Sequence, residues 1–116
     1  MEKIIVPKDE MPFSLLEEIG ISWSSIAFEC IQKKFTELSI LECEKILDDN
    51  YDKISDVLYD LRDSDFINDN CIGEEEIDES SGTWGYLHFE FNDVKKTKSI
   101  LEDETRDLLE IVINEI

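Results

Sequence analysis

Basic residues, histidine and long apolar runs are scarce in this sequence. Its eleven lysine and arginine residues stand against thirty aspartate and glutamate residues, so the net charge is −19. Direct binding to nucleic acid is not expected, because attraction to phosphates needs positive charge. Anionic lipid headgroups would repel the chain, and no run approaches the ~18 apolar residues of a membrane span. We therefore expect the chain to bind neither nucleic acid nor membranes directly.

Histidine and cysteine are too few for the common metal and catalytic sites. Three widely spaced cysteines and one histidine, with no CxxC motif, do not form a zinc-binding set. Cys30 and Cys43 fall on apolar helix faces, where we expect them to be buried. His88 lies in an expected strand without a nucleophile motif beside it. A minor enzyme or a metabolic subunit is the least favoured class, because no catalytic site is evident; we expect no enzyme, catalytic residue, metal or cofactor.

The first residues lack an apolar segment of signal-peptide length, which favours a cytoplasmic protein with reduced thiols. With 116 residues, 41% of them hydrophobic, the chain has the size and apolar content of a single domain over 1–116. Solubility alone needs far less negative charge than this chain carries. The excess of negative charge therefore indicates a functional role.

Apolar residues at steps of three and four predict helices along most of the chain. These cover about 14–20, 22–38, 40–64, and a last segment from 93 or 99 to 116. The pattern Ser-x-x-Glu, typical of a helix start, occurs at Ser14, Ser39 and Ser99. Asn50 leaves open whether the third segment is one long helix or two.

Two strands are predicted before the last helix. They cover about 71–78 and 83–91 with the loop 79–82 between them, whereas residues 3–6 form a short strand or an ordered arm. Alternation places Leu87, Phe89 and Phe91 on one face of the second strand. We therefore predict an α+β fold: a mostly helical single domain of about four helices, with a β-hairpin before the C-terminal helix. The opposite face of the second strand carries Trp84, Tyr86, His88 and Glu90.

The negative charge is concentrated in the middle of the chain. Residues 48–80 contain thirteen acidic and two basic residues, a net charge of −11. At about 100° per residue of a continuous helix, five of the aspartates fall within about 80° of one another, opposite the apolar face. We call this set the aspartate row: Asp49, Asp52, Asp56, Asp60 and Asp63.

The aspartate row is the strongest functional signal in the sequence. Carboxylates at i and i+4 repel each other and weaken a helix by a few tenths of a kcal/mol per pair. A solvated helix face more usually alternates charges of both signs. Because the repulsion brings no evident local benefit, we predict that the aspartate row binds a basic protein partner.

The expected hairpin is a second candidate binding surface. Acidic residues crowd its first strand and loop, next to the aromatic face of its second strand. Aromatic side chains within a polar rim are typical of binding hot spots. The alternative is that the final helix or the N-terminal arm covers this face, which would make Trp84 part of the core. The predicted partner-binding residues of the hairpin are Glu74, Glu75, Glu76, Asp78, Glu79, Trp84, Tyr86 and His88.

In size and charge the chain resembles small bacterial immunity proteins and also phage-encoded mimics of nucleic acid. The first resemblance implies an antidote that neutralises a cognate basic toxin, a nuclease of the contact-dependent-inhibition or bacteriocin type. The second implies an inhibitor of a DNA-binding defence complex (anti-restriction or anti-CRISPR). We favour the antidote, because the charge is concentrated rather than spread along an elongated surface. An unpaired hairpin edge would also permit a homodimer.

Overall fold

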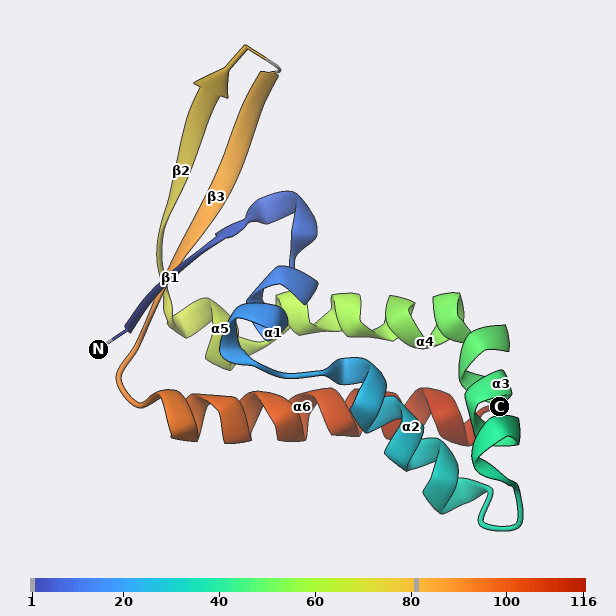
Figure 1. The fold of residues 1–116 in the computed structure, drawn as a ribbon. Coiled ribbons are helices and arrows are strands. Elements are labelled where there is room, and N and C mark those ends of the chain that lie inside the picture. Colours follow the sequence, from blue (N-terminus) through green and yellow to red (C-terminus); the bar gives the residue numbers. More distant parts are fainter. Residues whose placement is uncertain (1, 81) are drawn as a thin grey trace.

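Helical and alternating apolar spacings fold the chain into a helical body and a β-sheet (Figure 1). The structure, a computed structural model, describes residues 2–80 and 82–116, and within them all side chains except those of Glu2 and Glu79. It confirms the predicted α+β class, with the hairpin directly before the C-terminal helix. In chain order the described elements are β1 (Glu2–Pro7), the 3-10 helix η1 (Lys8–Glu10), α1 (Phe13–Ile19), α2 (Trp23–Lys34), α3 (Ile40–Asp49), α4 (Tyr51–Val57), the 3-10 helix η2 (Leu58–Asp63), α5 (Asp65–Asp69), β2 (Cys71–Glu79), β3 (Gly82–Phe91) and α6 (Val94–Asn114).

The C-terminal helix α6 is the centre of the helical body. Its buried residues include Leu101, Leu109 and Ile113, and α2 packs against it with Ala27 and Ile31 fully buried. Burying each of these leucine and isoleucine side chains stabilises the fold by roughly 1.5–3 kcal/mol. The α4 and η2 segments also pack along α6 (Figure 1). Among the described residues, no helix combines the length and the apolar character needed to cross a bilayer.

The sheet has the strand order β1-β3-β2, and both pairings are antiparallel. Residues 3–6, for which a strand or an arm was expected, therefore belong to a strand. Phe89 and Phe91 are buried on the inner face of β3, as the alternation predicts. The register of β1 ends at Pro7 opposite Tyr86, so residues 82–85 pair with β2 alone within the described chain. The tip of the hairpin consequently projects from the body (Figure 1).

Only one of the three predicted capping boxes is present in the structure. Ser39 forms a complete capping box: its hydroxyl accepts from the Glu42 backbone N–H at 3.2 Å, and the Glu42 carboxylate accepts from the Ser39 N–H at 3.3 Å. The helix predicted over about 14–20 is confirmed as α1, but the capping role of Ser14 is wrong, because α1 begins at Phe13 and Ser14 lies inside its first turn. Of the two starts left open for the last helix, 93 is confirmed: Asp93 caps α6, so the capping role predicted for Ser99, which lies inside that helix, is wrong.

The segment predicted over 40–64 is divided into α3, α4 and η2. The chain turns at Asn50, whose side-chain amide donates to the Ile46 carbonyl at 2.9 Å and satisfies an acceptor at the end of α3. From Leu58 to Asp63 the helix tightens to the 3-10 form, which advances by about 120° per residue. The expectation of one continuous helix face for all five aspartates is therefore wrong.

Candidate partner-binding surface

The aspartate row is distributed over three helical elements. Asp49 is the last residue of α3, which runs in a different direction from α4 (Figure 1). Asp52 and Asp56 lie on α4, about 40° apart by α-helical geometry. Asp60 and Asp63 lie on η2, where residues three apart eclipse each other. The aspartate row therefore consists of the pair Asp52–Asp56, the pair Asp60–Asp63, which points in a different direction around the helix axis, and a separate aspartate on α3.

All five side chains of the aspartate row are exposed to solvent. The ion pairs between described residues occupy other carboxylates, those of Glu29, Glu74, Glu75 and Glu102, and none involves the row. Each carboxylate of the row consequently presents its charge to solvent without a cation from the described chain. An external cationic surface could pair with these charges without first displacing an internal partner.

Helix α6 extends this acidic surface. A hollow of about 250 Å³ lies between η2 and α6, and it is lined on one side by Asp60 and Asp63 and on the other by Glu104 and Asp107. The Ser64 hydroxyl donates to the Glu104 carboxylate at 2.8 Å and fixes its position. Sequence reasoning missed Glu104 and Asp107, because helix periodicity does not show which polar flank of α6 adjoins η2.

Aromatic side chains form a second feature that sequence reasoning missed. Ring centroids lie 5.3 Å apart for Tyr51 and Trp23, 6.1 Å for Trp23 and Phe13, and 5.3 Å for Phe13 and Tyr59. We call this continuous set of four rings the aromatic strip: Tyr51, Trp23, Phe13 and Tyr59. A sequence signal was present, because Tyr51 and Tyr59 each directly precede an aspartate of the row. Neighbouring residues on a helix point about 100° apart, so the tyrosines flank the aspartates.

On the hairpin, the predicted acidic residues are largely engaged within the molecule. Lys8 donates to the Glu74 carboxylate at 2.6 Å, and this hydrogen bond and charge raise the pKa of the Lys8 ammonium. Glu75 pairs with His88 at 3.0 Å, and Asp78 accepts from the Thr83 hydroxyl at 2.7 Å. Glu76 is exposed, and the side chain of Glu79 lies outside the described residues.

The aromatic face of β3 points outward, as alternation along the strand predicts. Trp84 is 41% exposed and lies opposite Ile77 of β2, so the alternative that it belongs to the core is wrong. Tyr86 and His88 are half-buried on the same face. In Figure 1 the hairpin points away from the body, whereas α4 lies within it. The two predicted acidic surfaces are thus separate.

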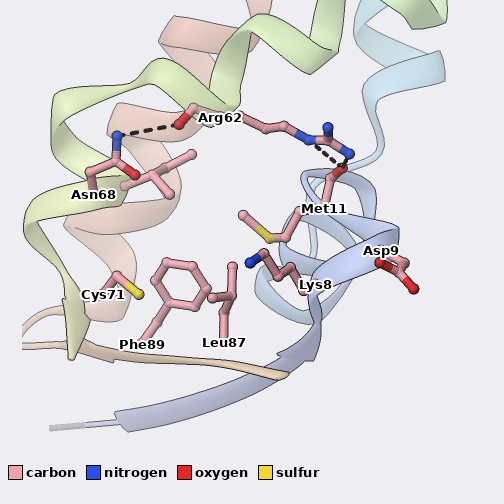
Figure 2. A pocket seen from close by; sticks show the side chains of 9 residues that line it. Lys8, Asp9, Met11, Arg62, Asn68, Cys71, Leu87 and Phe89 are labelled. Carbon is pink, nitrogen blue, oxygen red and sulfur yellow. Dashed lines mark hydrogen bonds between the residues drawn. The ribbon is translucent and has the colours of Figure 1, made fainter. Parts of the chain in front are cut away.

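A pocket of about 430 Å³ lies between the inner face of the sheet, η1 and η2. Figure 2 shows Leu87, Phe89 and Cys71 on one side of it and the Arg62 guanidinium turned toward the Met11 carbonyl. His88 occupies the opposite face of β3, so the sheet separates the only imidazole of the chain from the Cys71 thiol. The pocket therefore lacks a cysteine–histidine pair within the described chain.

Metal ligands do not gather in the described part of the chain, where no three histidine, cysteine, aspartate or glutamate side chains are placed to hold an ion. The chain matches no protein-family model, no curated protein and no solved structure. The candidate functional site is therefore the surface of α4 and η2, where Tyr51 and Tyr59 of the aromatic strip directly precede Asp52 and Asp60 of the aspartate row.

Proposed function

We propose that the protein is an antidote that binds and neutralises a basic bacterial toxin, a cognate nuclease, through the acidic surface of α4 and η2. The observation that carries this proposal is the exposure of the aspartate row without ion pairs among the described residues. Stacked like charges weaken a helix. A basic partner would relieve that repulsion, so the acidic surface would stabilise the complex although it destabilises the free protein.

Electrostatic attraction suits an antidote because it accelerates encounter. Charge complementarity raises association rate constants by orders of magnitude above those of neutral surfaces, up to about 10⁸–10⁹ M⁻¹s⁻¹ at low salt. A toxin that acts in the cytoplasm of its producer is then captured soon after it appears. The antidote would reside in that same compartment and would need no cofactor.

A nucleic-acid mimic is the second candidate, and the shape of the molecule favours it. The principal extents are 50 × 34 × 20 Å, and the acidic hairpin projects from one end of the body. An elongated acidic outline can occupy a groove made for nucleic acid. The angular step between α4 and η2 argues the other way, because it interrupts a regular line of carboxylates. Competition by duplex DNA separates the two: DNA displaces a mimic, whereas an antidote bound beside the active site stays bound.

Growth of a bacterial host tests the antidote proposal directly. Open reading frames adjacent to the gene are each expressed alone and together with this protein. We expect one neighbour to arrest growth and co-expression to restore it. If every neighbour is harmless, or if co-expression relieves none that is toxic, the proposal is wrong.

The toxin found in this way then tests the surface. Replacing Asp52, Asp56 and Asp60 together by Asn should slow association at least tenfold at low salt, because three steering charges are lost. The matched control replaces three exposed aspartates elsewhere, and stopped-flow fluorescence measures both rates. Equal slowing in the two variants would assign the effect to net charge rather than to the aspartate row. The control aspartates are Asp9, Asp69 and Asp103.

A further inference from the structure

The aromatic strip is unusual for the exposure of its rings. Tyr51 is 49% exposed and Tyr59 is 43% exposed, although each contacts another ring of the strip. The strip draws its rings from α1, α2, α4 and η2, so it crosses the body rather than following one helix. Exposed aromatic area that is continuous in this way marks interaction surfaces more often than scattered single residues do.

One end of the aromatic strip already holds a guanidinium group. The Arg62 guanidinium carbon lies 4.7 Å from the centroid of the Tyr59 ring. Its Nε and Nη2 atoms donate to the Met11 carbonyl at 3.1 and 2.8 Å, which fixes the side chain over the ring. One ring of the strip, that of Tyr59, therefore already stacks with a planar cation in this molecule.

The other end of the aromatic strip is open and acidic. A hollow of about 370 Å³ adjoins Trp23 and is also lined by Glu17, Ser22 and Ser24. Tyr51 contacts the Trp23 ring, and Asp52 follows it on α4. An indole face, a carboxylate and two hydroxyls supply stacking, charge and hydrogen-bond acceptors together. These are the groups that a guanidinium can use at one site.

We propose that the Trp23–Tyr51 end of the aromatic strip binds an arginine side chain of a basic protein. It thereby confers a preference for arginine over lysine that the aspartate row alone does not provide. Arginine stacks on aromatic faces and is less strongly hydrated than the lysine ammonium, whereas carboxylates exposed to water attract both cations by charge. This inference rests on the proposed function only in taking the partner to be a basic protein.

Peptides of equal charge separate stacking from simple attraction. Octa-arginine and octa-lysine are titrated into the protein at fixed ionic strength, with tryptophan emission as the readout. Trp23 and Trp84 are the two tryptophans of the chain, so Trp84→Phe isolates the strip and Trp23→Phe isolates the hairpin. We expect octa-arginine to bind more tightly and to change the emission of Trp23. A response confined to Trp84 would overturn the proposal.

Substitution of Tyr51 tests the ring itself. Tyr51→Leu keeps apolar area but removes the π face, and it should weaken octa-arginine binding by about two- to fivefold while leaving octa-lysine unchanged. Tyr51→Phe keeps the ring and should preserve the preference, which covers the case in which the leucine variant folds poorly. The matched control is Phe28→Leu, which removes a half-buried ring of α2 outside the aromatic strip and should change neither affinity.

The outcomes distinguish this inference from the proposed function. Equal affinity for the two peptides, unaffected by Tyr51→Leu, overturns the arginine site but leaves an acidic surface that binds basic proteins. Failure of both peptides to bind at low salt contradicts the arginine site and also removes the electrostatic basis of the antidote proposal. Restored growth in the host with equal peptide affinities would support the antidote and reject the arginine site.

Discussion

At the scale of single residues, burial separates the three thiols of the chain. Cys30 and Cys43 are buried, as their positions on apolar helix faces predict, whereas Cys71 is half-buried at the pocket beneath the sheet. Burial, assisted by the nearby charge of Glu110, raises the pKa of the Cys30 thiol. A raised pKa lowers the thiolate fraction at any given pH, and the thiolate is the reactive form.

We therefore expect one fast-reacting thiol in the native protein. At pH 8, an aromatic disulfide reagent should modify Cys71 first and reach Cys30 and Cys43 only on the timescale of unfolding. Absorbance counts the thiols, and peptide mass spectrometry identifies them. Cys71→Ser should abolish the fast phase; early labelling of Cys30 would contradict the burial argument. Raising the pH moderately should leave Cys30 labelling slow, because the raised pKa of the Cys30 thiol delays its ionisation.

At the scale of elements, one tetrapeptide occurs in two different structural settings. Ser-Ile-Leu-Glu at 39–42 opens α3, while the identical Ser-Ile-Leu-Glu at 99–102 lies within α6. The leucine of the first copy, Leu41, is 76% exposed, and that of the second, Leu101, is 0% exposed. The local sequence therefore does not determine the role of the serine. In the second copy, Ser99 does not cap a helix because Asp93 already caps α6 six residues earlier and the helix continues through Ser99.

The two serines provide a matched pair of substitutions. Ser39→Ala removes a capping hydroxyl and should lower the free energy of unfolding by about 1 kcal/mol. Ser99→Ala replaces a residue inside a helix, where alanine has the higher propensity, and should leave stability unchanged or raise it by up to about 0.5 kcal/mol. Chemical denaturation of both variants measures the difference. Equal losses would show that the capping box of Ser39 makes no net contribution.

Helix α2, helix α3 and the hairpin could be predicted because each has a strong local signal. Apolar steps of three and four mark the helices, and alternation marks β3. Helix α5 and the 3-10 form of η2 could not, because α5 has only five residues, too few to show an apolar period, and an α-helix and a 3-10 helix have nearly the same local pattern. The aromatic strip was missed for a different reason: Phe13 and Trp23 meet Tyr51 and Tyr59 only after the helices pack.

At the scale of the whole molecule, the fold divides a charge that is continuous in the sequence. Residues 48–80 carry −11 of the −19 charges. The helical part of this segment lies in the body, whereas β2 projects with the hairpin (Figure 1). Internal partners occupy Glu74 and Glu75 of the hairpin, but ion pairs among the described residues leave the aspartate row unoccupied. Sequence alone located the charge and could not show which part of it was already paired.

The exposed row makes the stability of the molecule depend on salt in a specific direction. Residues four apart on a helix lie ~6 Å apart along its axis, within the Debye length of ~10 Å at 0.1 M salt, so added sodium chloride screens their repulsion. The unfolding temperature should therefore rise between about 0.01 and 0.3 M salt. At low salt, the variant with Asp52, Asp56 and Asp60 replaced by Asn should be more stable than the natural protein, by up to about 1 kcal/mol.

That stability difference should shrink as salt is added, because screening removes in the natural protein the same repulsion that the substitutions remove in the variant. Thermal unfolding followed by circular dichroism across a salt series measures both slopes, and the variant with Asp9, Asp69 and Asp103 replaced by Asn reports the effect of net charge alone. If the natural protein is more stable than the variant with Asp52, Asp56 and Asp60 replaced at every salt concentration, the aspartates stabilise the isolated fold. The proposal that the aspartate row serves a partner would then lose its physical basis. If the charges are kept for binding at the expense of stability, their removal must raise the free energy of unfolding of the protein.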